Sequence, residues 1–375
     1  MATAHVVGTG SFLPGEAITN DDLLELVGPL PDEVLEGIQV KTRHWMVDPK
    51  TGEHRFANSE MAFNAAVTAL DRAGIEAAEV ELIVSSTASP EFLLPPMATL
   101  LQERLGIRSC AAVEIRSGCA GFVEALDIAR LYLERGDYTN ALVVGSESIS
   151  PLLVPVFYGK APDKIRMRDR MNPYNFGDGA GAVVLAADDR DGGIIGSAMG
   201  SIGGEKRPGM QIVGAGTHAP IHEQLKAKHL VVLDVDVVES GRFTPHLLVE
   251  SLRAILKGSG AKADEIDVCI IPEGNAGYMV EEFEGADVDT ADWLTIQPRV
   301  VENLALVGAT GTAAVPLALD HAVTTGLVKQ GHRVMLDALE TSKWKYAGVV
   351  LDWTLPTWGD DPVPTGGRED RREHP

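Results

Sequence analysis

The stretch that decides the fold is Ile115-Arg-Ser-Gly-Cys119-Ala-Gly-Phe122, where an extended run turns into an amphipathic helix. The apolar residues before it, 111–115, predict a short strand. Apolar residues after it recur at helical spacing, namely Phe122, Ala125, Leu126, Ala129 and Leu133. The pattern therefore places Cys119 at or near the N-terminus of a helix.

Cys119 at that position is a candidate covalent nucleophile. Unpaired backbone N–H groups and the positive end of a helix dipole favour a thiolate, which is the form of cysteine that attacks carbonyl carbons. The flanking residues Gly118 and Gly121 let backbone and substrate approach closely. The alternative is a small buried residue, since free cysteine is among the most buried residue types. The local pattern leaves both interpretations open.

Outward from Cys119, strands and helices alternate in two halves built from similar parts. Strands are predicted in the first half over 82–87, 111–115, 141–146 and 182–186, and in the second over 268–271, 334–338 and 349–353, with helices over 243–256 and 313–323. This alternation indicates a layered α/β architecture with buried sheets.

The composition divides the chain into four segments. The halves are expected over 1–188 and 229–356, and a glycine-rich segment over 189–228 is expected to connect them. Residues 357–375 are rich in proline, glycine and charge, which predicts a mobile tail.

Length and composition predict a soluble globular protein. The 375 residues, 45% of them hydrophobic, are enough for two domain-sized cores. The apolar runs are far shorter than the roughly 20 residues of a membrane helix, and no export signal is visible at the N-terminus. Three cysteines cannot form a disulfide framework and show no metal-ligand spacing, so a reducing cytoplasm fits best and no metal site is expected.

The net charge of −22, from 54 acidic and 32 basic residues, argues against nucleic acids and anionic membranes as partners. The densest positive cluster lies within 160–170 and includes Arg166, Arg168 and Arg170. Two interpretations of this cluster are equally supported. It is either a solvated loop balanced by nearby aspartates or a docking site for a phosphate-bearing carrier.

Several motifs together resemble the β-ketoacyl carrier-protein synthase III group of the thiolase superfamily, from about Val6 to Trp353. They are Gly8-Thr-Gly-Ser-Phe-Leu-Pro14, Thr19-Asn20, Cys119-Ala-Gly-Phe122, Val144-Gly-Ser-Glu147, Phe176-Gly-Asp-Gly-Ala-Gly181 and residues 313–319. The resemblance implies a thiolase-like fold, with two similar βαβαβαββ halves in a five-layered α-β-α-β-α arrangement. It also implies a homodimer without a bound cofactor, in which Cys119 accepts an acyl group as a thioester from coenzyme A or acyl carrier protein.

Two positions depart from the catalytic pattern of that family. Where the family has Pro-His-Gln-Ala-Asn, this chain has Pro272-Glu273-Gly-Asn275-Ala276, so Glu273 stands at the histidine position. Where the family has its catalytic asparagine, this chain has Ala309, followed by Thr310.

Two further segments also differ from the family. The glycine-rich loop beside the acyl site becomes residues 339–346, which include Ser342. The tryptophan that stacks on coenzyme A in some members has no counterpart upstream of Arg43-His44. Recognition of coenzyme A by the usual contacts is therefore not expected.

These substitutions disfavour decarboxylative condensation. In the family, the histidine and asparagine donate hydrogen bonds to the thioester oxygen as malonyl loses carbon dioxide. An ionised Glu273 only accepts hydrogen bonds, and Ala309 offers no side-chain donor. A carboxylate about 4 Å from the malonyl carboxylate would repel it by roughly 4 kcal/mol at an effective dielectric near 20, or about a thousandfold in rate.

A carboxylate can instead accept a proton. The leading hypothesis is therefore that Glu273 deprotonates a hydroxyl or amine that attacks the Cys119 thioester, in specialised metabolism. An ionised Glu273 would also raise the pKa of the thiol. Alternatively, Glu273 forms a salt bridge with Lys343 or Lys345, and Asn275 and Thr310 are candidate donors beside the substituted positions.

Two other functions remain open. Glu91, Phe92 and Leu94 lie in a loop that resembles the family's dimer crossover, where one subunit closes the acyl pocket of the other. A glutamate there is the α-proton base in some relatives, which keeps a carbon–carbon bond-forming Claisen reaction as an alternative. A non-catalytic partner subunit is the second alternative, although retention of Cys119 and its glycines weighs against it.

Overall fold

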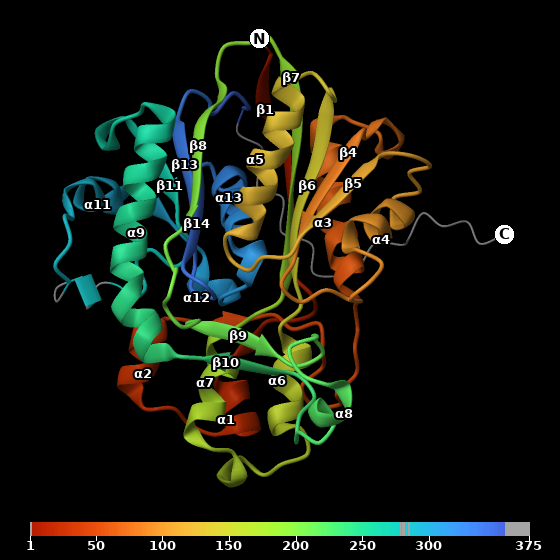
Figure 1. The fold of residues 1–375 in the computed structure, drawn as a ribbon, viewed down its shortest axis with the longest axis vertical. Helices are drawn as coiled ribbons and strands as arrows, with labels where there is room; N and C mark the ends of the chain where they lie inside the picture. The colour runs from red at the N-terminus through yellow and green to blue at the C-terminus, as the bar shows by residue number, and fades with distance from the viewer. Residues whose placement is uncertain (1, 278, 280–281, 284–285, 357–375) are drawn as a thin grey trace.

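The computed structural model describes residues 2–277, 279, 282–283 and 286–356, and the tail predicted over 357–375 lies outside them. Within this range the chain forms two five-stranded sheets that share one topology (Figure 1). The first sheet has the order β1 (Thr3–Phe12), β7 (Gly179–Asp188), β6 (Asn140–Glu147), β4 (Leu82–Ser86) and β5 (Ala111–Ile115). The second has the order β8 (Gly193–Ser201), β14 (Lys345–Asp352), β13 (Arg333–Glu340), β11 (Val268–Ile270) and β12 (Val300–Val301).

Strand directions match position by position in the two sheets. In the first sheet, β1–β7 and β7–β6 pair antiparallel, whereas β6–β4 and β4–β5 pair parallel. In the second, β8–β14 and β14–β13 pair antiparallel, and β13–β11 and β11–β12 pair parallel. The prediction of two similar halves is therefore confirmed at the level of strand order and direction.

Helices complete five layers. Helices α5 (Gly121–Glu134) and α13 (Ala314–Thr324) lie between the sheets and contact strands of both (Figure 1). Helices α3 (Asn58–Ala73) and α4 (Met97–Arg104) cover the outer face of the first sheet, and α9 (Val237–Ser259), with α11 (Ala291–Ile296) beside it, covers that of the second. This is the thiolase-like α-β-α-β-α arrangement that the family resemblance implied.

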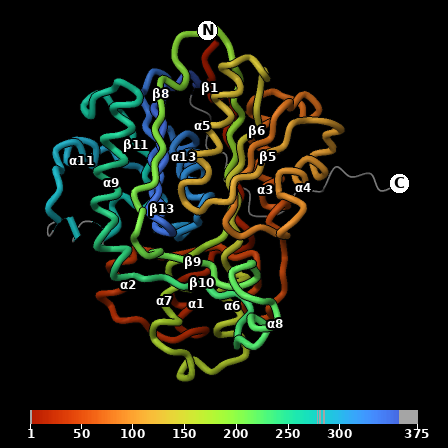
Figure 2. Tube along the Cα trace, viewed as in Figure 1, coloured from red at the N-terminus to blue at the C-terminus, as the bar shows by residue number. Residues whose placement is uncertain are grey.

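The remaining described strands and α-helices gather at one end of the two sheets, in the lower part of the view in Figures 1 and 2. They include a hairpin of β9 and β10 with helices below it. Their bounds are β2 (Ile18–Thr19), α1 (Asn20–Val27), α2 (Asp32–Ile38), β3 (Thr42–Arg43), α6 (Ser150–Phe157), α7 (Met167–Asn175), β9 (Met210–Val213), α8 (Ile221–Gln224), β10 (Val232–Val235) and α12 (Leu304–Val307). Five short 3₁₀ helices are η1 (Ala77–Glu79), η2 (Pro162–Lys164), η3 (Ala263–Glu265), η4 (Gln297–Arg299) and η5 (Gly311–Ala313).

The segment expected to connect the halves, residues 189–228, contains a strand of the second sheet. Strand β8 pairs with β14 along its whole length and forms an edge of that sheet. Its sequence, Gly-Ile-Ile-Gly-Ser-Ala-Met-Gly-Ser, is rich in glycine, a residue depleted in strands. The glycines interrupt the alternation of apolar and polar side chains, so the sequence pattern did not predict this strand. A side chain at Gly196 would overlap the backbone of α9, so the glycine allows the helix to lie close to the strand.

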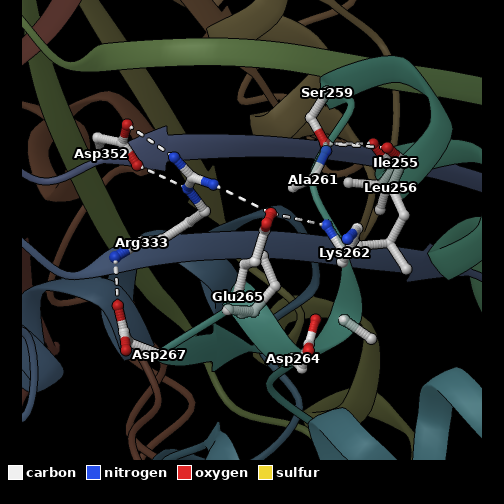
Figure 3. A network of polar contacts seen from close by, with 12 residues as sticks. Ile255, Leu256, Ser259, Ala261, Lys262, Asp264, Glu265, Asp267, Arg333 and Asp352 are labelled. Atoms are coloured by element: carbon white, nitrogen blue, oxygen red, sulfur yellow. Dashed lines mark hydrogen bonds and ion pairs between the residues drawn. The ribbon is translucent and has the colours of Figure 1, made fainter.

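A polar network at the edge of the second half ties three segments together (Figure 3). The Arg333 side chain donates to both carboxylate oxygens of Asp352, at 2.8 and 3.2 Å, and to Glu265 Oε2 at 3.2 Å. The Arg333 backbone N–H donates to Asp267 Oδ2 at 2.8 Å. This network joins the start of β13 to the end of β14 and to η3.

A buried ion pair joins the two halves. Arg72 on α3 donates to Asp320 Oδ1 on α13 at 2.6 Å, and the side chains are 13% and 2% exposed. Two hydroxyl groups of β1 also donate to this carboxylate: Thr9 Oγ1 to Oδ1 at 2.6 Å and Ser11 Oγ to Oδ2. One carboxylate of the second half thereby binds two elements of the first.

Across the described residues, no helix has the length and apolar character needed to cross a bilayer.

Candidate active site

Four side chains follow the carboxyl ends of strands from both sheets. Cys119 follows β5, Glu273 follows β11, and Glu147 and Glu340 are the last residues of β6 and β13. The carboxyl ends of neighbouring parallel strands lie at one edge of a sheet, where α/β proteins place their ligand sites. Cys119 and Glu273 line one cavity, and Cys119, Glu147 and Glu340 line a second one. The structure therefore places the predicted nucleophile and the predicted base beside the same cavity.

The turn before α5 holds Cys119. Its backbone is closed by a hydrogen bond from the Gly121 N–H to the Gly118 carbonyl, 2.9 Å long. A Cβ at Gly121 would overlap Ser86 Oγ and would lie 2.9 Å from the Cβ of Ser117. Glycine is therefore required at 121 for the turn to pack against β4, and this requirement fixes the position of the neighbouring cysteine.

Glu340 binds this turn from the other half of the molecule. Its Oε2 accepts hydrogen bonds from Ser117 Oγ at 2.8 Å, from the Gly118 N–H at 3.0 Å and from the Ala120 N–H at 3.3 Å. Its other oxygen accepts from Ser342 Oγ. The Glu340 side chain is 3% exposed. It accepts hydrogen bonds from backbone N–H groups beside Cys119, which the sequence analysis expected to stabilise a thiolate.

Lysines of the altered 339–346 loop have other described partners than Glu273. The Lys345 ammonium lies 2.8 Å from Ser117 Oγ and 2.8 Å from Glu124 Oε1. The Lys343 ammonium donates to the backbone carbonyls of Gly204, at 3.2 Å, and Lys206. Lys345 therefore supports the nucleophile turn from the side of Ser117.

Glu147 is held by donors from two segments, residues 87–89 and Thr312. Its carboxylate accepts from the backbone N–H groups of Ala88, Ser89 and Thr312 at 3.0, 2.8 and 3.3 Å. Thr87 Oγ1 donates at 3.2 Å, and the Ser89 hydroxyl also donates. Burial outweighs these hydrogen bonds and raises the pKa of Glu147 to about 7.

The pKa of the Cys119 thiol is raised well above its ordinary value. Burial is the largest cause, and the negative charges of Glu273, Glu340 and Glu147 add to it in that order. The expectation of a thiolate stabilised by the helix N-terminus is therefore wrong, because three carboxylates and burial outweigh the helix end. The predicted effect of Glu273 on the thiol is confirmed in direction. Cys119 needs a base that removes its proton when it attacks.

The segment with the altered asparagine position is built into the fold. Ala309 is buried, its N–H donates to the Asn175 carbonyl at 2.8 Å, and its carbonyl accepts from the Gly177 N–H at 3.1 Å. The next residue, Thr310, is fully buried, and its hydroxyl has no hydrogen-bond partner among the described atoms. Asn275 lies in the turn after Glu273, and its carbonyl is 3.1 Å from the side-chain amide nitrogen of Gln39 once that amide is oriented to satisfy its hydrogen bonds.

The Phe176-to-Gly181 loop supports the site from below through Asp178. This fully buried carboxylate accepts from the backbone N–H groups of Met46 at 2.7 Å, of Ser150 at 2.8 Å and of Ile149. The Ser150 hydroxyl donates to it as well, and burial raises the pKa of Asp178 to about 6. The loop thus ties the start of β7 to Met46 and to the segment after β6.

The larger cavity beside Cys119 has a volume of about 1100 Å³ and is lined largely by apolar side chains. Glu91 and Leu93 of the predicted crossover loop line it, whereas Phe92 and Leu94 are 52% and 81% exposed and do not. The Glu91 carboxylate accepts from the N–H of Ser59, at 3.1 Å, and from its hydroxyl, at 2.6 Å. Glu91 therefore caps the first turn of α3 while bordering the cavity.

The smaller cavity has a volume of about 480 Å³, and Cys119 and Glu273 are among the residues that line it. Its walls come from α2, α7, the start of α9 and the turn after β11. Apolar side chains dominate them, among others Val34, Ile38, Met171, Val235, Val238, Ile271 and Met279. The two cavities meet at Cys119, so the nucleophile can be reached from two directions.

The predicted docking arginines have different surroundings. Arg166 and Arg168 are 69% and 75% exposed and pair with Asp169 at 2.8 and 3.3 Å. Arg170 donates to the carbonyls of Pro29 at 3.0 Å, Pro162 at 3.0 Å and Ile165 at 3.1 Å, so it shapes the loop.

Arg43 lies just after the segment in which some family members have the tryptophan that stacks on coenzyme A, and its side chain is buried. It donates to the Ile18 carbonyl at 3.0 Å and to the Tyr174 carbonyl at 2.9 Å. Burial lowers its pKa to about 10.

Sequence reasoning missed two site residues, Glu147 and Glu340. A signal for both existed, because each is the last residue of a strand that the sequence predicted almost to its end. A charged residue there points to the edge where the site lies. No group of His, Cys, Asp or Glu side chains in the described parts of the chain has the arrangement of a metal site.

Comparison with known proteins identifies relatives of the chain. The family model for 3-oxoacyl-[acyl-carrier-protein (ACP)] synthase III matches residues 113–203, and the model for the C-terminal part of the same synthase matches 256–353. A β-ketoacyl-[acyl-carrier-protein] synthase III of Xanthomonas campestris pv. campestris is 30% identical over 341 residues, which cover 89% of this chain and 94% of the relative.

Solved structures show the same likeness. The 3-oxoacyl-(acyl carrier protein) synthase III FabH from Pseudomonas aeruginosa PAO1 superposes with a TM-score of 0.76 at 25% identity, covering 94% of this chain and 99% of that one. AbyA1, a tetronic acid condensing enzyme, superposes with a TM-score of 0.78 at 27% identity, covering 93% of this chain and 100% of that one.

Proposed function

Because the chain belongs to the 3-oxoacyl-[acyl-carrier-protein] synthase III family of condensing enzymes, we propose that it loads an acyl group onto Cys119 and transfers it without malonyl decarboxylation. The donor is an acyl thioester of acyl carrier protein or coenzyme A, and the acceptor is a hydroxyl or an amine. The observation that carries this proposal is Glu273, which stands at the family's histidine position and lines a cavity together with Cys119. Such a site repels a malonyl carboxylate and supplies a proton acceptor.

Acylation begins with the Cys119 thiol. Since its pKa is raised, the thiol gives its proton to Glu273 as the sulfur attacks the carbonyl carbon of the donor. A bond forms between Cys119 Sγ and that carbon, the donor's own C–S bond breaks, and the donor thiolate leaves with the proton. The apolar walls of the larger cavity suit an acyl chain bound next to Cys119.

Transfer reverses these roles. The acceptor's oxygen or nitrogen attacks the thioester carbon, the C–S bond to Cys119 breaks, and the proton of the acceptor passes through Glu273 to the cysteine sulfur. The products are an ester or an amide and the free thiol. No step requires a donor at position 309, where the family's enolate-stabilising amide is absent.

The test is the intact-protein mass after incubation with acyl-coenzyme A or acyl carrier protein. We expect the wild type to gain one acyl mass and Cys119→Ala to gain none. Glu273→Gln should slow acylation at least tenfold, whereas Glu36→Gln on the exposed face of α2 should acylate at the wild-type rate. A wild-type protein that gains no acyl mass from either donor would contradict the proposal.

The same samples separate transfer from condensation. An added alcohol or amine should remove the acyl group as an ester or amide, and malonyl thioester should leave it in place. Release as a β-ketoacyl product with a new carbon–carbon bond would favour the Claisen alternative, for which Glu91 at the larger cavity is the candidate base.

We also propose that the enzyme works as a homodimer with the crossover loop at its interface. The consecutive apolar residues Phe92, Leu93 and Leu94 are 52%, 70% and 81% exposed, which is unusual for a solvent-facing loop. Light scattering of the wild type should give twice the chain mass of 40.0 kDa, and Leu94→Glu should shift it toward the monomer. An unchanged monomer in both would contradict this arrangement.

A further inference from the structure

The two cavities that meet at Cys119 differ in the charge of their walls. Among the described residues that line the smaller cavity, the charged side chains are Glu33, Glu273 and Glu282, and none is lysine, arginine or histidine. The walls of the larger cavity include His54, Arg55, Arg116 and Lys343 as well as glutamates. Only the smaller cavity combines an apolar interior with charges of one sign.

The three glutamates stand at the two ends of the smaller cavity. Glu33 on α2 and Glu282 are exposed, so they lie at its opening. Glu273 is partly buried at the inner end, where its charge raises the pKa of Cys119. Between the ends, the side chains are apolar or uncharged. A ligand of this cavity therefore meets negative charge, then an apolar passage, then the base and the nucleophile.

Three arginines are close in sequence to residues that line the smaller cavity, and none of the three lines it. Arg170 precedes the lining residue Met171, yet it donates to three backbone carbonyls. Arg168 pairs with Asp169. Arg242 follows the lining residue Gly241 but does not line the cavity. The opening thus keeps its negative character.

We propose that the acceptor is an amine carried on an apolar molecule and that it enters through the smaller cavity; this rests on the acyl transfer proposed above. An ammonium group is attracted by Glu33 and Glu282, whereas the phosphates of coenzyme A and a carboxylate-bearing acceptor are repelled. The apolar passage then strips water from the ammonium group, which lowers its pKa and favours the neutral, nucleophilic amine.

The chemistry at the inner end balances in atoms and protons. The ammonium first releases one proton to solvent through the opening. The neutral nitrogen attacks the Cys119 thioester carbon, a C–N bond forms and the C–S bond breaks. Glu273 takes the remaining proton from the nitrogen and returns it to the sulfur. The products are an amide and the Cys119 thiol.

Binding can be tested without acylation, by protection of Cys119 from iodoacetamide. Hexylamine, hexanol and hexanoate are added at equal concentrations near neutral pH, and alkylation of Cys119 is followed by peptide mass. Cys110, which lines neither cavity, is the reference thiol in the same chain. We expect hexylamine to protect Cys119 several-fold better than hexanol and hexanoate to protect least. Equal protection by hexylamine and hexanol would overturn the proposal.

Matched variants locate the effect. An exposed charge at about 10 Å changes ligand occupancy about twofold in water, so Glu33→Gln with Glu282→Gln should lower the preference for hexylamine about fourfold. Glu76→Gln, an exposed residue before the amino end of β4 and outside the cavity, should leave it unchanged. High salt should reduce the wild-type preference to that of the double variant, since it screens exposed charges. An unchanged preference in the double variant would contradict entry by this route.

A second readout separates this inference from the proposed function. Cys119 is acylated with the neutral donor octanoyl-N-acetylcysteamine, and its discharge by hexylamine or hexanol is followed by mass. Selective discharge to the amide supports the inference. Equal discharge to the ester overturns it and leaves acyl transfer standing. If Cys119 is not acylated but hexylamine still protects it selectively, the proposed acyl transfer is contradicted and the amine site is retained.

Discussion

Strands β6 and β13 hold the same place in the two sheets and end in glutamates with different surroundings. Each is the third of five strands, is eight residues long and ends in a buried glutamate near Cys119. Glu147 accepts hydrogen bonds mainly from the 87–89 segment of its own half. Glu340 reaches across to the nucleophile turn of the other half. The glutamate at the end of β6 thus holds the 87–89 segment of its own half in place. The glutamate at the end of β13 instead places a negative charge beside Cys119.

Removal of Glu147 should have the largest effect on stability. Glu147→Ala leaves the backbone N–H groups of Ala88, Ser89 and Thr312 without their acceptor. At about 1–3 kcal/mol for the buried Thr312 donor and about 1 kcal/mol for each of the two partly buried donors, the loss in unfolding free energy is about 3–5 kcal/mol. Urea unfolding measures it, with Glu36→Ala as a surface control expected within about 0.5 kcal/mol of wild type. A loss below about 1 kcal/mol would mean that Glu147 is not a structural centre of its half.

Asp337 marks a second difference between the strands. It lies three residues before Glu340, at the place that Val144 holds on β6. It is fully buried, accepts from Ser251 Oγ, and its Oδ2 has no partner among the described atoms. Burial raises its pKa from 3.8 to about 7. The folded state therefore keeps a proton that the unfolded chain releases in this range.

The stability contributed by Asp337 should be complete below about pH 4 and lost as the pH rises to about 7. The shift corresponds to at most about 4 kcal/mol. Asp337→Asn, which cannot ionise, should flatten this fall, so that the variant is more stable than wild type at pH 8 and similar at pH 4. Urea unfolding at several pH values measures the difference. An Asn variant that falls in parallel with wild type would assign the pH dependence to other groups.

Removal of the Glu340 charge should increase the reactivity of Cys119. Glu340→Gln keeps the size of the side chain and removes a negative charge that raises the thiol pKa. We expect iodoacetamide to modify Cys119 about three- to tenfold faster at pH 8, since one pKa unit corresponds to a tenfold change in thiolate. Cys110 is the reference thiol. Glu147→Gln should have the smaller effect, because Glu147 contributes least of the three charges. The reverse order would contradict the division of roles between the two glutamates.

Substitution of the first residue of β13 should give the smallest change in the free energy of unfolding. Asn140 on β6 binds the Glu79 carbonyl and the Glu81 N–H, and Arg333 on β13 binds Glu265 and Asp352 in the corresponding region (Figure 3). Arg333→Lys removes the two-pronged contact with Asp352 and should cost about 0.5–1 kcal/mol in unfolding free energy. The loss should shrink at high salt. A loss unchanged by salt would indicate packing by the arginine stem instead of charge.

The parts of the fold set by periodicity were predictable. Residues 111–115 and 268–271 have apolar runs bounded by breaks, and both are strands in the structure. Strand β8 was not predicted, because its glycines interrupt the alternation of apolar and polar side chains. One of them, Gly196, allows α9 to lie close to the strand. Helix α3, from Asn58 to Ala73, was also absent from the prediction, although its apolar residues recur at helical spacing.

The candidate site was predictable residue by residue but not in its electrostatics. Cys119 and Glu273 were found from local pattern and resemblance, and both line the smaller cavity. The state of the thiol depends on Glu147 and Glu340, which are 28 and 221 positions away from Cys119. Strand pairing within the first sheet brings Glu147 near Cys119, and packing of the two halves brings Glu340 there. The sequence analysis predicted a Cys119 thiolate from the helix N-terminus alone. In the folded protein, burial and the neighbouring carboxylates favour the thiol instead.

The buried contact between Arg72 and Asp320 has a consequence for cooperativity. Since α13 of the second half is bound by α3 and β1 of the first, neither half has a complete core of its own. We expect heat or urea to unfold residues 2–356 in a single transition, and we expect a chain cut between β7 and β8 to yield fragments that fold only together. On this expectation, the duplicated architecture is a single folding unit.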